Sequence, residues 1–206
     1  DNLRTCLTEV TGDVLQVAEV TVLECSSRQI IDLTGLSSFT SLVNLNLYDN
    51  QIVDITSIAA LKNLDGLSLI TNKVSDLSPL SGLINLSGFL GLDSNQITDI
   101  SPLVGLVNLD TLRLFNNQVS DLSPLSELPA LTDLDLRSNQ LSDLTPLSGL
   151  TNLTYLLLSN NQLINAAPLS NWVSLTKLDL AGNQITDLSF LTGLVELEDL
   201  DLFENA

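Results

Sequence analysis

The sequence predicts a solenoid, a chain coiled into repeated units that stack in a row. Three observations lead to this fold class: an internal repeat of 22 residues with one 23-residue exception, a leucine pattern inside each unit, and a short amphipathic segment before the first unit. Of the 206 residues, 44 % are hydrophobic, which is enough for a packed core.

The repeats start at Val20 with a degenerate copy, VTVLECSSRQIIDLTGLSSFTS, and become regular at Leu42. We expect about nine copies over residues 20–206, the last of which, LEDLDLFENA, is incomplete. The regular copies read LVNLNLYDNQIVDITSIAALKN, LDGLSLITNKVSDLSPLSGLIN, LSGFLGLDSNQITDISPLVGLVN, LDTLRLFNNQVSDLSPLSELPA, LTDLDLRSNQLSDLTPLSGLTN, LTYLLLSNNQLINAAPLSNWVS and LTKLDLAGNQITDLSFLTGLVE.

Each unit predicts one strand and one layer of the core. In L-x-x-L-x-L the last two leucines alternate with polar residues, as in a strand with one inward face, and the strands of successive copies would pair in parallel. The later leucines, such as Leu77, Leu80 and Leu83, would line the opposite wall. Each copy therefore leans on its neighbours, and none is expected to fold alone.

An asparagine recurs where the chain must bend away from each strand. An inward amide there can satisfy backbone groups that would otherwise be buried without partners, so each asparagine can bridge adjacent turns. We therefore interpret the column as structural and not as a glycan or ion site. Its members are Asn50, Asn72, Asn95, Asn117, Asn139, Asn161, Asn183 and Asn205.

An aspartate column follows, and it could be mistaken for a calcium array. An Asp before [IL]-[ST]-P-L suits the start of a short helical turn, because a short polar side chain caps free amides and proline fixes φ where no donor is needed. Calcium needs several oxygens from one loop, whereas this pattern offers one carboxylate per turn, so we expect no metal. The columns consist of Asp32, Asp54, Asp76, Asp99, Asp121, Asp143, Asn165 in place of Asp, and Asp187, with Pro79, Pro102, Pro124, Pro146 and Pro168.

Residues 1–19 predict a helical N-terminal cap over the first repeat. Apolar residues recur there at helical spacing, Asp1 or Asn2 can cap the helix, and Thr11-Gly12-Asp13 would end it. The apolar residues are Leu3, Cys6, Leu7 and Val10.

The two cysteines are placed to join this cap to the solenoid. Cys25 occupies an inward strand position of the first copy, where other copies have leucine, and it would lie beneath the helix that carries Cys6. A disulfide would stabilise the fold by about 3 kcal/mol in the chain-entropy model and implies an oxidising compartment. Two buried free thiols that act as apolar fillers are the alternative.

The pattern L-x-x-L-x-L-x-x-N-x-[IVL]-x-D-[IL]-[ST]-P-L-x-x-L-x-N resembles the bacterial 22-residue leucine-rich repeat typified by the internalin family of surface proteins, over about nine-tenths of the chain. The resemblance implies a leucine-rich-repeat solenoid, a right-handed β/3-10 superhelix with its parallel β-sheet on the concave face and short helical turns on the convex face. It also implies a secreted or cell-surface protein that contacts a host or another cell. The Cys6–Cys25 pairing is not part of the internalin pattern, which favours a secreted protein of another bacterial group.

The composition argues against several functional classes. The formal charge of −18 would repel nucleic acid and anionic membranes, and no stretch reaches the roughly 20 apolar residues of a membrane helix. The chain has no histidine, no glycine-rich phosphate loop and no carboxylate pair in an obvious cleft, so we expect neither an enzyme nor a cofactor. Acidic pairs such as Asp133 with Asp135 and Asp199 with Asp201 are expected on an open, solvated surface, where they could steer a basic partner.

The outward strand positions and the position just after each strand would form the concave surface. Of the chain's eight aromatic residues, five fall in these columns, whereas Phe39, Trp172 and Phe190 fall at core positions. Exposed aromatics beside arginine are typical of interface hot spots. We therefore predict a partner-binding patch that consists of Tyr48, Ile70, Phe89, Arg113, Phe115, Arg137, Tyr155 and Leu157.

The patch has a simpler interpretation, in which neighbouring strand side chains, such as Phe89 and Phe115, only cover one another. The copy at 86–108 carries its extra residue beside Phe89, between Gly88 and Gly91, which predicts a bulge that re-aims the aromatic ring.

These features favour a non-catalytic protein-recognition module of a secreted or cell-surface bacterial protein, which binds a protein partner on its concave face. Binding of a glycan or small ligand on the same face is one alternative, although a broad face without a pocket disfavours it. A structural spacer in a larger surface protein is another, although uniformly polar columns would be needed to support it. We expect any export signal to have been removed and the chain to continue beyond Ala206, because the last layer lacks a lid.

Overall fold

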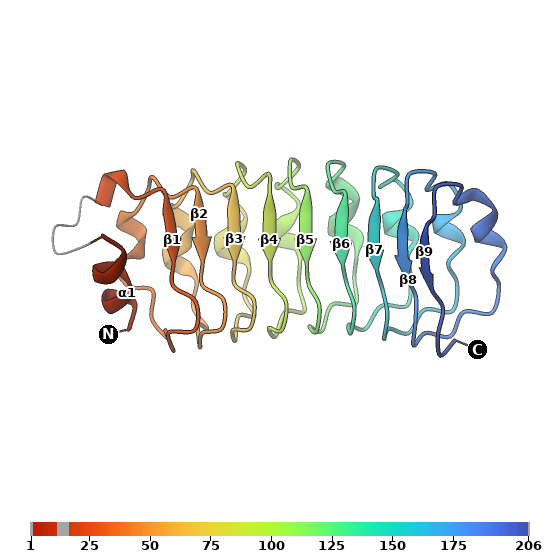
Figure 1. Cartoon of the computed structure of the whole chain (residues 1–206), viewed down its shortest axis with the longest axis horizontal. Coiled ribbons are helices and arrows are strands. Elements are labelled where there is room, and N and C mark those ends of the chain that lie inside the picture. Colours follow the sequence, from red (N-terminus) through yellow and green to blue (C-terminus); the bar gives the residue numbers. More distant parts are fainter. Residues whose placement is uncertain (1, 12–16, 206) are drawn as a thin grey trace.

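The structure of the protein, a computed structural model, describes residues 2–11 and 17–205, with backbone alone at Val10 and Thr11. Nine parallel strands of three residues each lie side by side in sequence order and form one open sheet, with short 3-10 turns behind it (Figure 1). The strands are β1 (Val22–Glu24), β2 (Asn44–Asn46), β3 (Gly66–Ser68), β4 (Phe89–Gly91), β5 (Thr111–Arg113), β6 (Asp133–Asp135), β7 (Tyr155–Leu157), β8 (Lys177–Asp179) and β9 (Asp199–Asp201).

Within residues 2–11 and 17–205, the helices consist of one α-helix and a series of 3-10 turns. The α-helix, α1, spans Asn2–Thr11 and precedes the sheet. The 3-10 turns are η1 (Val17–Glu19), η2 (Leu36–Ser38), η3 (Thr56–Ala60), η4 (Ser78–Leu80), η5 (Ser101–Leu103), η6 (Ser123–Glu127), η7 (Thr145–Leu147), η8 (Ala167–Leu169) and η9 (Ser189–Gly193). The predicted solenoid is therefore confirmed.

The strands pair in the register that the repeat predicts. Val22 pairs with Asn44, and the same one-repeat step recurs along the sheet. The extra residue of the long copy is taken up before β4, since Leu67 pairs with Leu90 and Ser68 with Gly91. From β4 onward the step returns to 22 residues, so one insertion shifts the start of a strand without disturbing the rest of the sheet.

The core is a stack of leucine and isoleucine layers. The inward strand leucines, such as Leu112, and the turn leucines, such as Leu125, are fully buried and belong to one continuous cluster that runs from α1 to η9. The three aromatics predicted to be internal, Phe39, Trp172 and Phe190, are also buried. Burial at about 25 cal/mol per Å² of apolar surface makes this stack the main source of stability.

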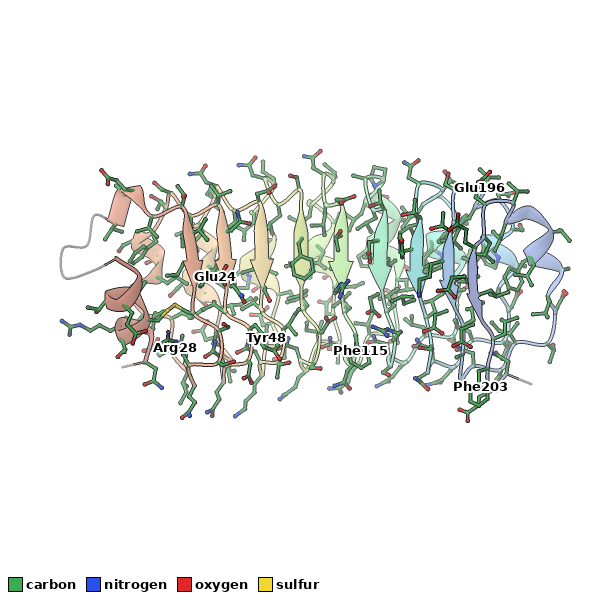
Figure 2. The ribbon with its side chains drawn as sticks, viewed as in Figure 1. Glu24, Arg28, Tyr48, Phe115, Glu196 and Phe203 are labelled. Carbon is green, nitrogen blue, oxygen red and sulfur yellow. A yellow bond between two sulfur atoms is a disulfide. The ribbon has the colours of Figure 1, made fainter. Side chains whose placement is uncertain are left out.

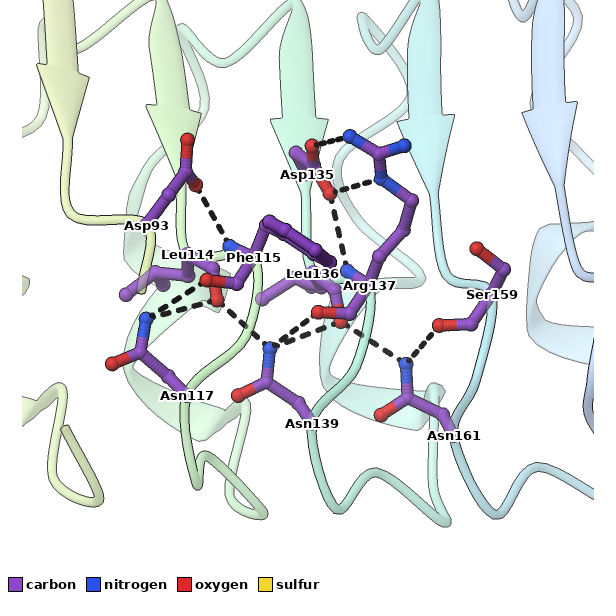
Figure 3. Close-up of polar contacts among 10 residues, drawn as sticks. All are labelled: Asp93, Leu114, Phe115, Asn117, Asp135, Leu136, Arg137, Asn139, Ser159 and Asn161. Atoms are coloured by element: carbon purple, nitrogen blue, oxygen red, sulfur yellow. Dashed lines mark hydrogen bonds and ion pairs between the residues drawn. The ribbon is translucent and has the colours of Figure 1, made fainter. Parts of the chain in front are cut away.

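The asparagine column forms the predicted ladder (Figure 3). Nδ2 of Asn117 donates to the carbonyl of Leu92 in the preceding repeat at 3.0 Å and to the carbonyl of Leu114 in its own repeat at 3.1 Å. Its Oδ1 accepts the N–H of Ile97 at 3.0 Å. Asn139 and Asn161 repeat this arrangement, so each amide satisfies backbone groups of two neighbouring coils.

The aspartate column caps the 3-10 turns, as predicted, but from one residue further out than an ordinary N-cap. Oδ1 of Asp54 accepts the N–H of Thr56 at 2.8 Å and its hydroxyl at 2.5 Å, while Ile55 is the residue at the N-cap. These bonds hold the pKa of Asp54 below its usual range, because both favour the charged carboxylate. The prolines of η4, η5, η6, η7 and η8 lie in the first turn, where no backbone donor is needed.

The cap is tied to β1 and to the segment just after it by a covalent bond and by polar contacts. Cys6 and Cys25 form a disulfide with their Cα atoms 5.8 Å apart, and both side chains are buried. Arg28 pairs with Glu9 at 2.5 Å, and Nδ2 of Asn2 donates to the carbonyl of Gln29 at 3.1 Å. Leu3 and Leu7 are buried as predicted, whereas the predicted roles of Asp1, the Val10 side chain and the Gly12-Asp13 break lie outside the described residues.

Candidate protein-interaction surface

The candidate surface is the outer face of the sheet, which we call the strand face. It presents the first and third residues of each strand and the residue two positions after the strand. Figure 2 shows Tyr48 and Phe115 just beyond the ends of their strands, with Phe203 in the same position at the far end of the row. All eight residues of the predicted patch occupy such positions.

Phe89 lies across its own strand. A Cβ placed on Gly91 would lie 2.6 Å from Cε1 of Phe89 and 2.8 Å from Cδ1 of Ile70, so both side chains occupy the space that Gly91 leaves open. The glycine is fully covered as a result. The Phe89 ring thus packs over Gly91, where the absence of a side chain leaves room for it, beside Ile70 from the neighbouring repeat.

Arg113 continues this cluster on β5. Its guanidinium carbon lies 6.0 Å from the centre of the Phe89 ring, at the outer limit of a cation–π contact. Nε of Arg113 is buried, and within residues 2–11 and 17–205 it has no hydrogen-bond partner. The Nε of Arg113 is therefore not bound to a carboxylate, although the charge of Arg113 still acts on Asp93 and Asp133.

Phe115 and Arg137 form a second aromatic–arginine pair one repeat further on. The Arg137 guanidinium carbon lies 5.1 Å from the Phe115 ring centre. Its Nε and Nη2 donate to the two carboxylate oxygens of Asp135 at 2.9 and 2.6 Å (Figure 3). This bidentate, charge-assisted pair is strong and geometrically specific.

The prediction of a solvated Asp133–Asp135 pair is wrong for Asp135, which is only 1 % exposed. Arg137 covers it, because residues two apart on a strand project from the same face. Asp133 is half-buried, and its burial raises the pKa of its carboxyl above the usual range, although Arg113 opposes the shift. Asp199 and Asp201 are exposed, as predicted.

Asp93 is a second buried carboxyl beside the two aromatic–arginine pairs. Burial raises its pKa to about 6, and Asp135 adds to the shift. The N–H of Phe115, which donates to Asp93 Oδ1 at 2.8 Å, opposes it, as do the charges of Arg113 and Arg137. Sequence reasoning did not single out Asp93, because an acidic residue in an outward column indicates a solvated side chain.

The structure thus gathers only part of the predicted patch into one cluster. Ile70, Phe89 and Arg113 are joined through Gly91, and Phe115 is joined to Arg137. Tyr48 and Tyr155 stand apart on the strand face, 44 % and 46 % exposed, and Leu157 is half-buried. The two tyrosines are thus the most exposed members of the predicted patch.

A hollow of about 300 Å³ opens on the strand face beside Phe89. Its base lies over β3, where the outward residues Gly66 and Ser68 are small, and it reaches Asn44, Asn46 and Glu24 on the preceding strands. The expectation of a broad face without a pocket is therefore wrong at this position. The signal was present as two small residues on one strand next to an aromatic on the next.

The described part of the chain contains no group of three or more His, Cys, Asp or Glu residues that could hold a metal ion. Over the same residues, no helix has the length and apolar character needed to cross a membrane.

Comparisons with known proteins give consistent results. A family model described as leucine-rich repeats (2 copies) matches residues 89–127, 129–171 and 173–206, more than half of the chain. None of the curated proteins matches the chain.

Among solved structures, the chain is similar to internalin InlF from Listeria monocytogenes, with 33 % identity, a TM-score of 0.83, and coverage of 99 % of this chain and 69 % of that one. It is also similar to internalin C2 of the same organism, with 32 % identity, a TM-score of 0.91, and coverage of 98 % and 92 %. A third similar structure is the leucine-rich-repeat ectodomain of the Arabidopsis thaliana receptor kinase GASSHO1/SCHENGEN3, in complex with Casparian strip integrity factor 2. It shares 25 % identity, with a TM-score of 0.78 and coverage of 90 % and 24 %.

Proposed function

Because the chain belongs to the leucine-rich-repeat family and is internalin-like, we propose that it is a protein-recognition module that binds a protein partner on its strand face. This fold is a non-catalytic recognition scaffold, and its concave sheet surface corresponds to the strand face. The Arabidopsis relative supports the proposal, since its structure was solved as a complex.

The observation that carries the proposal is the placement of the outward aromatics. Tyr48 and Tyr155 leave nearly half of their side-chain surface in water, and Phe89 and Phe115 are supported beneath arginines. Aromatic and arginine side chains on a rigid frame are the usual anchors of protein interfaces. The scaffold columns need none of these residues, so the repeat alone does not explain them.

We further propose that the protein is bacterial and acts outside the cytoplasm, as a secreted or cell-surface protein. The Cys6–Cys25 disulfide supports this location, because such bonds persist in oxidising compartments. The charge of −18 favours a partner with basic surface and disfavours nucleic acid.

Affinity capture from host-cell and bacterial-envelope extracts would identify the partner, and alanine substitutions would then map its site. We expect Tyr48→Ala, Phe115→Ala and Tyr155→Ala each to weaken binding by roughly tenfold or more, as hot-spot substitutions do. Ile84→Ala and Val173→Ala are matched controls, because these side chains are 59 % and 52 % exposed and lie away from the strand face.

Equal affinities for the three strand-face variants and the two controls would refute this site. Binding on a glycan array without a protein partner would replace the proposal with sugar recognition.

A further inference from the structure

The hollow beside Phe89 is lined by an acidic residue and by neutral residues. Its lining consists of Glu24, Asn44, Leu45, Asn46, Gly66, Leu67, Ser68 and Phe89, with one negative charge and no basic residue. A second hollow of about 250 Å³ on the same face, lined by Arg137, Lys177, Asp179, Asp199 and Asp201 among others, differs in this respect. In the second hollow Lys177 pairs with Asp199 at 2.5 Å, and Arg137 is bound to Asp135. The chain's own lysine and arginine thus supply positive charge to that hollow, whereas the first hollow has none.

The polar end of the first hollow offers hydrogen-bond acceptors. Nδ2 of Asn46 donates to Glu24 Oε2 at 2.7 Å, which holds the carboxylate over β2. Asn46 Oδ1 is already used by the N–H of Tyr48. Asn44 Oδ1 leans over Gly66, only 2.5 Å from the position of a Cβ there, so its carbonyl oxygen lies in the space that the glycine leaves open.

The other end is aromatic. Phe89 on β4 forms the wall at this end. Arg113 on β5 lies 6.0 Å from the centre of the Phe89 ring and is not part of the lining. Two strand spacings, about 10 Å, separate β2 from β4. The hollow therefore runs from a carboxylate and amide oxygens, across the small residues Gly66 and Ser68, to a ring.

We propose that this hollow is a subsite for one lysine or arginine side chain of the protein partner. The charged head would bind at Glu24 and at Asn44 Oδ1, which lies over Gly66, and the methylene stem would lie over Ser68 toward Phe89. Long basic side chains combine a cationic end with an apolar stem, which is the order of groups that the hollow presents. The inference rests on the proposed function and identifies one chemical element of the partner.

A small probe tests the subsite without the partner. Amide chemical shifts of the ¹⁵N-labelled protein would be followed during titration with N-acetyl-arginine-N-methylamide. The neutral isostere N-acetyl-citrulline-N-methylamide would be titrated in parallel. We expect saturable shifts at Gly66, Ser68 and Phe89 with the arginine probe, at least fivefold weaker binding with citrulline, and no saturable shifts at Asp179 or Asp199.

Three variants complete the test. Glu24→Gln should weaken the arginine probe at least fivefold, and Gly66→Val should abolish its binding by filling the hollow. Glu196→Gln removes the same charge from an exposed site at the far end of the molecule and should change nothing (Figure 2).

Several outcomes would overturn the subsite: equal binding of citrulline, tighter binding of N-acetyl-leucine-N-methylamide or of N-acetylglucosamine, or arginine shifts spread over all acidic residues. Failure of the proposed function is distinguishable from these, because strand-face variants would then leave the affinity for the captured partner unchanged while the probe still bound.

Discussion

The two aromatic–arginine pairs of the strand face have the same composition and are held differently. Arg137 stacks on Phe115 and binds Asp135 through two charge-assisted hydrogen bonds. Arg113 lies at a longer distance from Phe89, and its buried Nε has no partner among the described residues. The difference arises from the residue two positions before each arginine, which projects from the same face: it is Asp135 before Arg137 and Thr111, which has no carboxylate, before Arg113. One arginine is therefore bound to its own strand face by a carboxylate, whereas the other has a buried Nε without a hydrogen-bond partner among the described residues.

The largest effect is expected when the bound arginine is removed. Arg137→Ala leaves the Asp135 carboxylate buried without its cation, and we expect the free energy of unfolding to fall by about 3 kcal/mol. Urea denaturation followed by circular dichroism measures this change. Arg137→Lys, which keeps the charge but loses the bidentate geometry, should lie between the wild type and Arg137→Ala. A loss below about 0.5 kcal/mol for Arg137→Ala would remove the distinction between the two arginines.

Gly91→Ala is expected to disturb the Phe89–Arg113 pair, because the Phe89 ring packs over Gly91. A Cβ there would meet the Phe89 ring and Ile70, so the ring must turn outward and leave Arg113. We expect a loss of about 1 kcal/mol, near the lower end for overpacking, because the obstructing atoms belong to side chains and can move. Changed ring-proton shifts of Phe89, with unchanged shifts of Phe115, would support this account, whereas an unmoved ring would contradict it.

Because the pKa of Asp93 is raised, the free energy of unfolding is expected to depend on pH. Its folded pKa of about 6 exceeds the unfolded value of about 3.9, so the folded protein binds more protons between these values and the stability due to Asp93 falls as the pH rises through 6. The Asp93→Asn variant lacks this loss. Its stability relative to the wild type should increase by about 1 kcal/mol from pH 4 to pH 7, a value reduced for screening by solvent and the nearby arginines. A flat difference across that range would show that Asp93 is ionised throughout.

The smallest effect is expected for Arg113, whose buried Nε has no hydrogen-bond partner among the described residues. Arg113→Gln should change the free energy of unfolding by less than about 1 kcal/mol, because a ring contact at 6.0 Å contributes little. Thermal unfolding beside Arg137→Ala provides the comparison. Equal losses for the two substitutions would mean that Arg113 has a structural partner in solution.

The sequence predicted the scaffold well because each scaffold position recurs with a fixed environment. Asn117 and Asp54 do what every member of their columns does, so one repeat explains the others. The strand face repeats its positions but not its residues, and there the sequence predicted exposure correctly for side chains that act alone, such as Tyr48 and Tyr155, while their role in binding stays a prediction. The burial of Asp135 depends on Arg137 folding back over it, and the hollow depends on Gly66 next to Phe89 of another repeat. Such contacts join residues at different positions of the repeat, so they cannot be predicted by comparing one position across the repeats.

The asparagine ladder also bears on how such a chain can change in length. Each amide reaches only one coil back: Asn117 bonds a carbonyl 25 residues earlier and an N–H 20 residues earlier, and Asn95, which follows the extra residue, bonds groups 26 and 21 residues earlier. A whole unit could therefore be duplicated or deleted at a repeat boundary and leave every remaining amide with the same kind of neighbour. Insertions of any other length must be absorbed locally, as happens ahead of β4. The span of the strand face can thus evolve in steps of one coil.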